Sequence, residues 1–167
     1  FWEPSVTTRA LTTAEVERLV EAFGTAAKIA SAAGIDAVEL HAHSGYLRDQ
    51  FMTALWNKRT DRYGGDLDGR LRFPAEIIQA GKRSAGADFP IIFRFGLTHY
   101  LEGGREIEEG LEIARRLEAA GVDAFDIDAG AYETLYWAKP TTYSSPGCLT
   151  GLAEIVLPAA SLMVGFP

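Results

Sequence analysis

The 167-residue sequence has very little cysteine and no surplus of positive charge. Its single cysteine, Cys148, excludes an internal disulfide and any metal site built from several cysteines. With 16 Lys and Arg against 23 Asp and Glu, the formal net charge is −7, which argues against nucleic acids and anionic membranes as partners. Such sparse use of cysteine is typical of a reducing compartment, so we expect a cytoplasmic location.

Long apolar runs and targeting signals are also missing. No uninterrupted apolar stretch approaches the roughly 20 residues that a membrane-spanning helix needs. The opening residues, FWEPSVTTRA, lack the charged start and apolar core of a signal peptide, and because the first residue is Phe we expect the natural chain to extend upstream. What is present, 47% hydrophobic and 23% charged residues, is typical of a globular protein, and the length predicts one domain over residues 1–167.

Helices and short apolar strands are predicted to alternate along the chain. The spacing of apolar residues predicts helices near 12–33, 70–84, 105–120 and 150–159, with a further helical turn near 47–53. Strands are expected at 35–40, 90–96, 122–128 and 161–165. The first helix should begin with a capping box formed by Thr12 and Glu15. Strands that are apolar throughout and alternate with helices indicate an α/β protein with a helix-covered parallel sheet.

The longer loops all follow predicted strands, whereas the links from helix to strand are short. The segments AAGIDAVEL (32–40) and AAGVDAFDI (119–127) also repeat one pattern of helix end, glycine, aspartate and strand. Such junctions look alike in any α/β protein, but in (β/α)8 barrels the functional loops follow the strands. Because a whole barrel typically needs about 250 residues, the chain is either a smaller α/β fold or part of a barrel.

Two histidines stand where the first predicted strand ends, in AVELHAHSGYLRDQF (37–51). Side chains alternate along a strand, so Glu39, His41 and His43 are expected to point the same way. A His-x-His pair holds the metal in some barrel hydrolases, with Asp126 and Asp128 as further ligands here, although a catalytic zinc needs about three protein ligands. Histidines hydrogen-bonded at the start of a loop fit the same spacing.

Tyr46 and Arg94 are two further candidates for a functional role. Tyr46 directly follows Gly45 in the loop after the first strand, where a tyrosine either donates a proton to a carbanion-like centre or covers the core. Arg94 lies inside an apolar strand, where a buried charge needs a partner, and Glu39 or Asp128 is the expected one. The residues alone leave these alternatives open.

The segment NKRTDRYGG (57–65), followed by RLRF (70–73), resembles a motif highly specific to the Old Yellow Enzyme family of NADH:flavin oxidoreductases. Residues 34–78 as a whole look like this family, and PIIFRFG is similar to its fifth strand. The segment FDIDAGAYETLYWAKPTTY most resembles the branch with the 2,4-dienoyl-CoA reductases, enoate reductases and bile-acid-modifying enzymes. The resemblance runs from about residue 10 to the end of the sequence.

The resemblance implies an FMN-containing (β/α)8 TIM barrel, of which this chain would hold roughly strands four to seven with their helices. The N-terminal strands and the C-terminal part that binds the FMN phosphate would then be missing. The implied reaction passes hydride from NAD(P)H through the flavin to an activated C=C bond of a small-molecule enone, enoate or enoyl thioester. An iron–sulfur cluster is expected only in a full-length protein, because Cys148 alone cannot hold one.

The same resemblance implies roles for several side chains. Tyr46 matches the family's proton donor, and His41 matches the first of two residues that bind the substrate carbonyl, where a hydrogen bond stabilises the developing enolate. The second of these positions usually holds His or Asn, but here it is Ser44. We therefore expect either His43 or Ser44 to fill it.

Arg94 matches an arginine beside the flavin, whose charge would stabilise the anionic reduced cofactor. Tyr132 lies near a second active-site position of the dienoyl-CoA reductases. Arg59, Asp61 and Arg70 of the specific motif have a structural interpretation instead, as charges that hold a long loop through mutual ion pairs.

Three interpretations follow: a segment of an FMN-dependent ene-reductase, an inactive half-barrel fragment with exposed sheet edges, and a metal-dependent barrel hydrolase built on His41 and His43. The first two are compatible, because one describes the encoded protein and the other the 167-residue chain. We favour the first as the encoded function and expect the chain alone to be inactive. The sequence favours neither NADH nor NADPH and indicates no oligomeric state.

Overall fold

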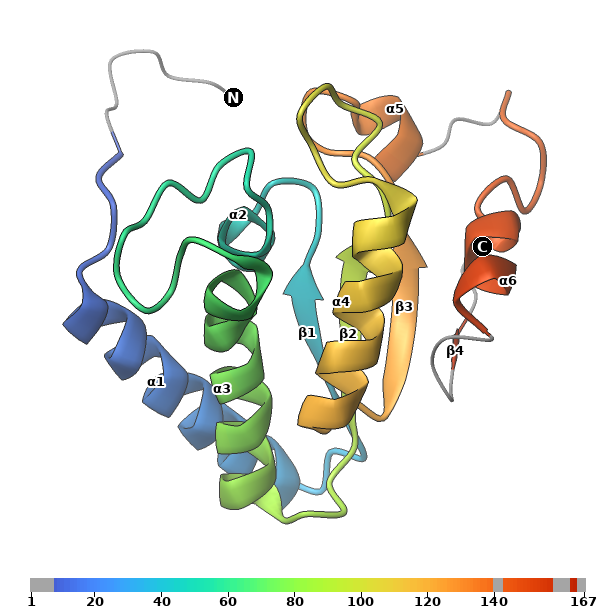
Figure 1. The fold of residues 1–167 in the computed structure, drawn as a ribbon. Helices are drawn as coiled ribbons and strands as arrows, with labels where there is room; N and C mark the ends of the chain where they lie inside the picture. Colours follow the sequence, from blue (N-terminus) through green and yellow to red (C-terminus); the bar gives the residue numbers. More distant parts are fainter. Residues whose placement is uncertain (1–7, 140–142, 158–162, 165–167) are drawn as a thin grey trace.

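The computed structural model describes residues 8–139, 143–157 and 163–164 (Figure 1). One parallel sheet holds four strands in chain order: β1 (Val38–Ala42), β2 (Ile91–Gly96), β3 (Ala124–Asp128) and β4 (Met163–Val164). The helices are α1 (Thr13–Ala32), α2 (Leu47–Met52), α3 (Leu67–Ala85), α4 (Ile107–Ala120), α5 (Leu135–Ala138) and α6 (Thr150–Val156). The predicted α/β class with a parallel sheet is confirmed.

Capping side chains mark where the two longest helices begin. Helix α1 starts with the predicted capping box: the Glu15 N–H donates to Thr12 Oγ1 (3.3 Å), and the Thr12 N–H donates to the Glu15 carboxylate (2.8 Å). Helix α3 starts three residues earlier than predicted because Asp66 caps it by accepting from the Gly69 N–H (2.9 Å). Capping side chains thus decide where both helices begin.

The first strand begins later than predicted. Gly34 takes a positive φ of 79°, and the Ile35 N–H donates back to the Ala30 carbonyl (3.1 Å), so Ile35 closes helix α1 instead of opening a strand. Strand β1 therefore starts at Val38. Helix α5 was not predicted within the loop after β3, and of the predicted strand 161–165 only 163–164 lie among the described residues.

The sheet has one apolar and one polar face. Leu40, Phe93, Phe95 and Phe125 alternate onto the buried side, where they share one core with residues of α3 and α4. In Figure 1, α4 lies in front of the strands and α3 stands beside β1. The opposite side is called the polar face below, and it carries the charged or ionisable side chains Glu39, His41, Arg94, Asp126 and Asp128. Because His41, Arg94 and Asp126 are in register on adjacent strands, they form a row across this face.

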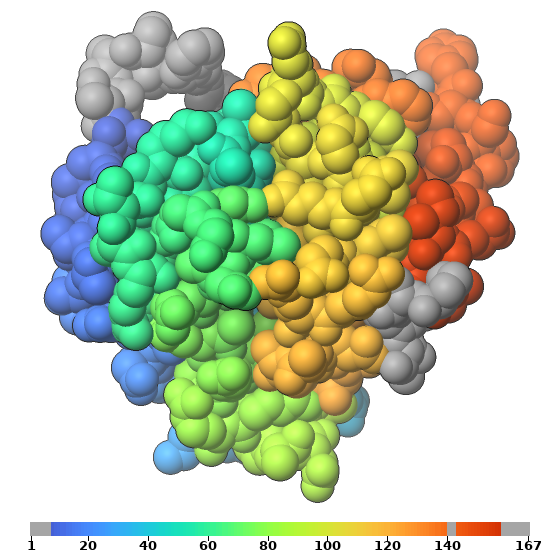
Figure 2. Space-filling model, in the orientation of Figure 1, coloured from blue at the N-terminus to red at the C-terminus, as the bar shows by residue number. Residues whose placement is uncertain are grey.

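The segment 57–65 folds as a loop fixed by charges. Arg59 Nη2 lies 2.5 Å from Asp61 Oδ2, as predicted, and Arg59 Nη1 also donates to the Leu11 carbonyl (2.6 Å). The expectation that Arg70 joins this pair was wrong. Arg70 instead donates to the carbonyls of Met52 and Gly65 and pairs with Glu109. This last pair ties α3 to α4, whose surfaces meet in Figure 2.

Candidate functional site

The loop after β1 brings His41, His43 and Tyr46 together. Ring centroids lie 4.2 Å apart for His41 and His43, and 4.8 Å apart for His41 and Tyr46. The chain reaches this arrangement through a tight turn in which Ser44 (φ 53°) and Gly45 (φ 76°) are both left-handed. A left-handed serine is uncommon, so the surrounding contacts must hold this turn.

His43 and Ser44, the two candidates for the second carbonyl-binding position, are both buried and bonded to each other. The Ser44 hydroxyl lies 2.7 Å from His43 Nδ1, which also lies 3.0 Å from Asp128 Oδ2. The contact with the Ser44 hydroxyl is the hydrogen bond of this ring nitrogen, and because a hydroxyl both donates and accepts, it fits either tautomer of His43. Burial lowers the pKa of His43 to about 4 despite the nearby Asp128 charge, which keeps the ring neutral at pH 7.

Arg94 is held by two carboxylates on the polar face. Its Nη2 lies 3.0 Å from Asp128 Oδ2, and its Nε lies 3.3 Å from Asp126 Oδ2. The predicted partner Asp128 is confirmed, whereas the partner Asp126 was missed. Asp128 contacts both His43 and Arg94, so one carboxylate connects the loop after β1 to strand β2.

Asp126 is almost fully buried, and within the described residues neither of its carboxylate oxygens accepts a hydrogen bond. Burial raises its pKa to about 6 against the opposing effect of the Arg94 charge. The folded chain therefore binds a proton on Asp126 more tightly than the unfolded chain does. The stabilisation linked to this proton is complete below pH 4 and is lost as the pH rises through 6.

We expect Asp126→Asn to raise the Tm by about 2–4 °C at pH 8, because a neutral amide replaces a poorly solvated buried charge while Asp128 still pairs with Arg94. This advantage should fade as the pH falls from 6 toward 4, where Asp126 itself becomes protonated. Thermal unfolding of both proteins across this range measures the difference. A variant less stable than the parent at pH 8 would show that the ionised carboxylate is stabilising.

A buried polar cluster lies behind the Tyr46 turn and was not anticipated. Asp49, His99 and Arg105 are each fully buried. Asp49 Oδ1 accepts from Arg105 Nη2 (2.8 Å) and from His99 Nε2 (3.1 Å). One sequence feature hinted at this cluster: Asp49, three positions after Tyr46, lies in a predicted helical turn together with the apolar Phe51 and Met52. In the structure all three side chains are buried.

Tyr132 stands apart from this cluster. It follows β3 and is 60% exposed, and in the part of the chain that the structure describes no hydrogen bond or ring contact joins it to His41, His43 or Tyr46. The aromatic rings beyond it pack on the neighbouring loop: Trp137 of α5 lies 4.5 Å from the ring of Tyr100. The structure thus places Tyr132 in a loop at the same end of the sheet as Tyr46, and no hydrogen bond or ring contact joins the two among the described residues.

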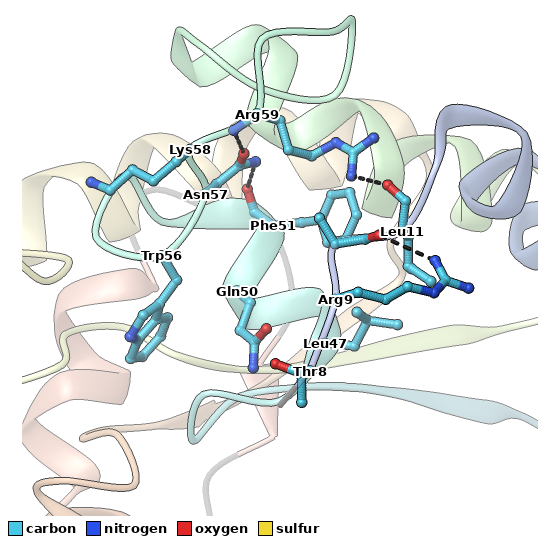
Figure 3. Close-up of a pocket in the computed structure, with 11 residues that line it drawn as sticks. Thr8, Arg9, Leu11, Leu47, Gln50, Phe51, Trp56, Asn57, Lys58 and Arg59 are labelled. Atoms are coloured by element: carbon cyan, nitrogen blue, oxygen red, sulfur yellow. Dashed lines mark hydrogen bonds between the residues drawn. The ribbon is translucent and has the colours of Figure 1, made fainter. Parts of the chain in front are cut away.

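A cavity of about 330 Å³ lies beside α2 (Figure 3). Gln50 and Phe51 line it opposite Arg9 and Leu11. The Arg9 guanidinium is already paired with Glu15, as Arg59 is with Asp61. The cavity includes none of the histidines, Tyr46 or Arg94, so it is separate from the candidate site.

Two wider features bear on the function. Among residues 8–139, 143–157 and 163–164, no three His, Cys, Asp or Glu side chains cluster as a metal site would require, so the geometry does not favour the metal-dependent hydrolase. Within the same residues, every helix is too short or too polar to cross a bilayer.

The sequence comparison identifies the family. Residues 2–151 match the model of the NADH:flavin oxidoreductase / NADH oxidase family, and the chain belongs to this family. The resemblance to the Old Yellow Enzymes is thereby confirmed. Two similar proteins are the cinnamate reductase of Clostridium sporogenes, 44% identical over 92% of this chain, and the NADH oxidase of Thermoanaerobacter brockii, 46% identical over 93%.

Solved structures agree with this assignment. 2-Naphthoyl-CoA reductase, in complex with 2-naphthoyl-CoA, superimposes with a TM-score of 0.87 at 35% identity over 94% of this chain. The present chain spans only about a quarter of the length of these proteins: 25% of the cinnamate reductase, 24% of the NADH oxidase and 24% of the naphthoyl-CoA reductase chain.

Proposed function

We propose that this chain is a segment of an FMN-dependent ene-reductase and supplies its proton donor and substrate-binding side chains. The observation that carries the proposal is the meeting of His41, His43, Tyr46 and Arg94 where β1 and β2 present the polar face. The four strands would correspond to strands four to seven of a (β/α)8 barrel, whose functional groups gather at the carboxyl ends of the strands. The other strands and the phosphate-binding part would lie outside residues 1–167.

The polar face fits a flavin through Arg94. Its guanidinium is held by Asp126 and Asp128 yet remains 30% exposed, so it presents a fixed positive charge beside the row that includes His41. Such a charge suits the edge of the isoalloxazine ring that becomes negative on reduction. Arg94 would thus help to hold the FMN, which when bound would supply the hydride-transfer chemistry between NAD(P)H and the β-carbon of the substrate.

The remaining steps belong to this chain's own side chains. Tyr46 would donate its phenolic proton to the α-carbon, so that one hydride and one proton add across the C=C bond while NAD(P)H becomes NAD(P)⁺. His41 would donate a hydrogen bond to the carbonyl oxygen, where negative charge develops. We assign this contact to His41 because His41 is partly exposed, whereas His43 is buried and its Nδ1 already lies beside Ser44 and Asp128.

The substrate class would be an enone, an enoate or an enoyl thioester. The His41 and Tyr46 pair would act on a double bond that is conjugated to a carbonyl. The enolate that develops needs a hydrogen-bond donor at its oxygen, which would be His41, and a proton at its α-carbon, which would come from Tyr46. Tyr132 would contact the distal part of the substrate from the loop after β3.

Retention of FMN after incubation and desalting, seen as the visible absorbance of a bound flavin, tests whether this chain alone binds the cofactor. Arg94→Ala should weaken FMN binding by about 10- to 100-fold, because a charge-assisted hydrogen bond to the flavin is lost. Arg115→Ala removes an exposed arginine of α4 that pairs with Glu112 of the same helix (3.5 Å), and this variant should bind FMN like the parent. Equal binding by all three proteins would contradict the role of Arg94, and a colourless parent would contradict flavin binding by this chain alone.

A further inference from the structure

The buried cluster behind the candidate site continues into the turn that carries Tyr46. The second carboxylate oxygen of Asp49, Oδ2, accepts from the Gly45 N–H at 2.9 Å. Gly45 is the left-handed residue directly before Tyr46, and the Tyr46 N–H in turn donates to the His43 carbonyl (3.1 Å). Asp49 therefore holds the backbone on which the proposed proton donor sits.

Asp49 is itself fixed from the loop after β2. The Arg105 N–H donates to His99 Nδ1 (3.0 Å), so Nδ1 is an acceptor and the hydrogen of the neutral ring is on Nε2, which faces Asp49 Oδ1. Arg105 also donates through Nη1 to the Gly96 carbonyl at the end of β2 (2.6 Å). Burial opposes ionisation of Asp49, but the Arg105 charge and the His99 hydrogen bond hold its pKa below the usual range.

The same contacts reach the loop after β3. Thr134 Oγ1 donates to the His99 carbonyl (2.7 Å) and accepts from the Ala131 N–H (2.8 Å). The Gly130 N–H donates to the Thr98 carbonyl (2.8 Å). Three loops that follow three neighbouring strands are thus joined by one buried chain of hydrogen bonds, although they are far apart in the sequence.

We infer that Asp49 is a positioning residue that fixes Tyr46, and that His99, Arg105 and Thr134 hold the loop of Tyr132 in register with it. The catalytic part of this inference rests on the proposed function of Tyr46. The left-handed Ser44–Gly45 turn persists only when its surroundings determine it, and the Gly45 N–H bond to Asp49 does so directly. Proton transfer depends steeply on such placement, because a small displacement of the donor slows the reaction strongly.

Asp49→Asn tests the inference with little change in shape. The amide has one accepting oxygen, so its NH2 group must face either the Gly45 N–H or the donors of Arg105 and His99. Asp123→Asn is the matched control: Asp123 also accepts from a cation, Lys82, and from a backbone N–H, that of Ile91, but at the opposite end of the sheet. Comparing the two variants distinguishes the general effect of removing a carboxylate charge from the specific effect of removing it behind Tyr46.

The first measurement is amide hydrogen exchange of the 167-residue chain, each rate being compared with core amides of β2 in the same protein. Asp49→Asn should speed exchange at Gly45 by about tenfold or more, and Asp123→Asn should leave it unchanged. Thr134→Val, which keeps the side-chain shape, should speed exchange at Ala131 instead. Unchanged protection of Gly45 in Asp49→Asn would overturn the inference, and this measurement needs no flavin.

The second measurement is NAD(P)H-dependent reduction of cinnamate or 2-cyclohexenone by the flavin-loaded full-length enzyme. Asp49→Asn should lower kcat by about tenfold with little change in KM, and should cause no further loss when Tyr46 is already Phe, because Asp49 acts through Tyr46. If the double variant instead showed the product of the two single-variant losses in kcat, Asp49 would not act through Tyr46 and would serve stability alone. A full-length parent without turnover would contradict the proposed function, whereas the exchange result would still decide whether Asp49 fixes the turn.

Discussion

Tyr46→Phe is expected to lower the rate of C=C reduction by about 100-fold or more, because the variant cannot supply a proton to the α-carbon. The substitution removes one hydroxyl group and keeps the ring, which packs against His41 at 4.8 Å. Tyr46 is 55% exposed, so the Tm should stay within about 1 °C of the parent value. Steady-state rates with NAD(P)H and an enone or enoate, measured on the flavin-loaded full-length enzyme, provide the test.

The control for this prediction is Tyr136→Phe. Tyr136 is 63% exposed on α5, and its closest ring partner is Trp137 rather than a histidine. The two variants lose the same atoms from similarly exposed tyrosines, so only the position differs. Equal rates for Tyr46→Phe and the parent would mean that water or another side chain provides the proton, and the assignment of Tyr46 would then be wrong.

What the sequence predicted well depends on neighbouring residues. The capping box of Thr12 and Glu15, the helix at 47–53 and the alternation of strands with helices are all set by residues a few positions apart. The partner of Arg94 was also partly predictable, because a charge within an apolar strand needs an opposite charge and Asp128 was available.

What the sequence did not predict depends on register between distant segments. The contact between His43 and Asp128 requires β1, β2 and β3 to align so that the end of β3 reaches the loop after β1. The same alignment sets Asp126 beside Arg94. In the buried cluster, Asp49 lies 50 residues from His99 and 56 from Arg105 along the chain, and no local pattern encodes such pairs.

The effect of a glycine within a helix also depends on a distant segment, and Gly110 leads to the second prediction with a large effect. From propensity alone, Gly110→Ala should stabilise α4 by up to about 1 kcal/mol. In the structure, however, a Cβ at Gly110 would overlap the carbonyl oxygen of Leu97 and lie 2.8 Å from Leu97 Cδ1. Leu97 is fully buried directly after β2, so neither it nor the backbone can move away easily.

We therefore expect Gly110→Ala to destabilise the chain by about 1–3 kcal/mol, a Tm decrease of roughly 3–10 °C for a protein of this size. Gly151→Ala is the matched control, because an added Cβ at this exposed position of α6 meets no atom within 4 Å. That variant should gain up to about 1 kcal/mol from propensity. Thermal unfolding should thus move in opposite directions for the same substitution. If both variants were stabilised, helix α4 could shift away from Leu97. The close approach of α4 to the end of β2 would then not constrain the following loop, which holds His99 and Arg105.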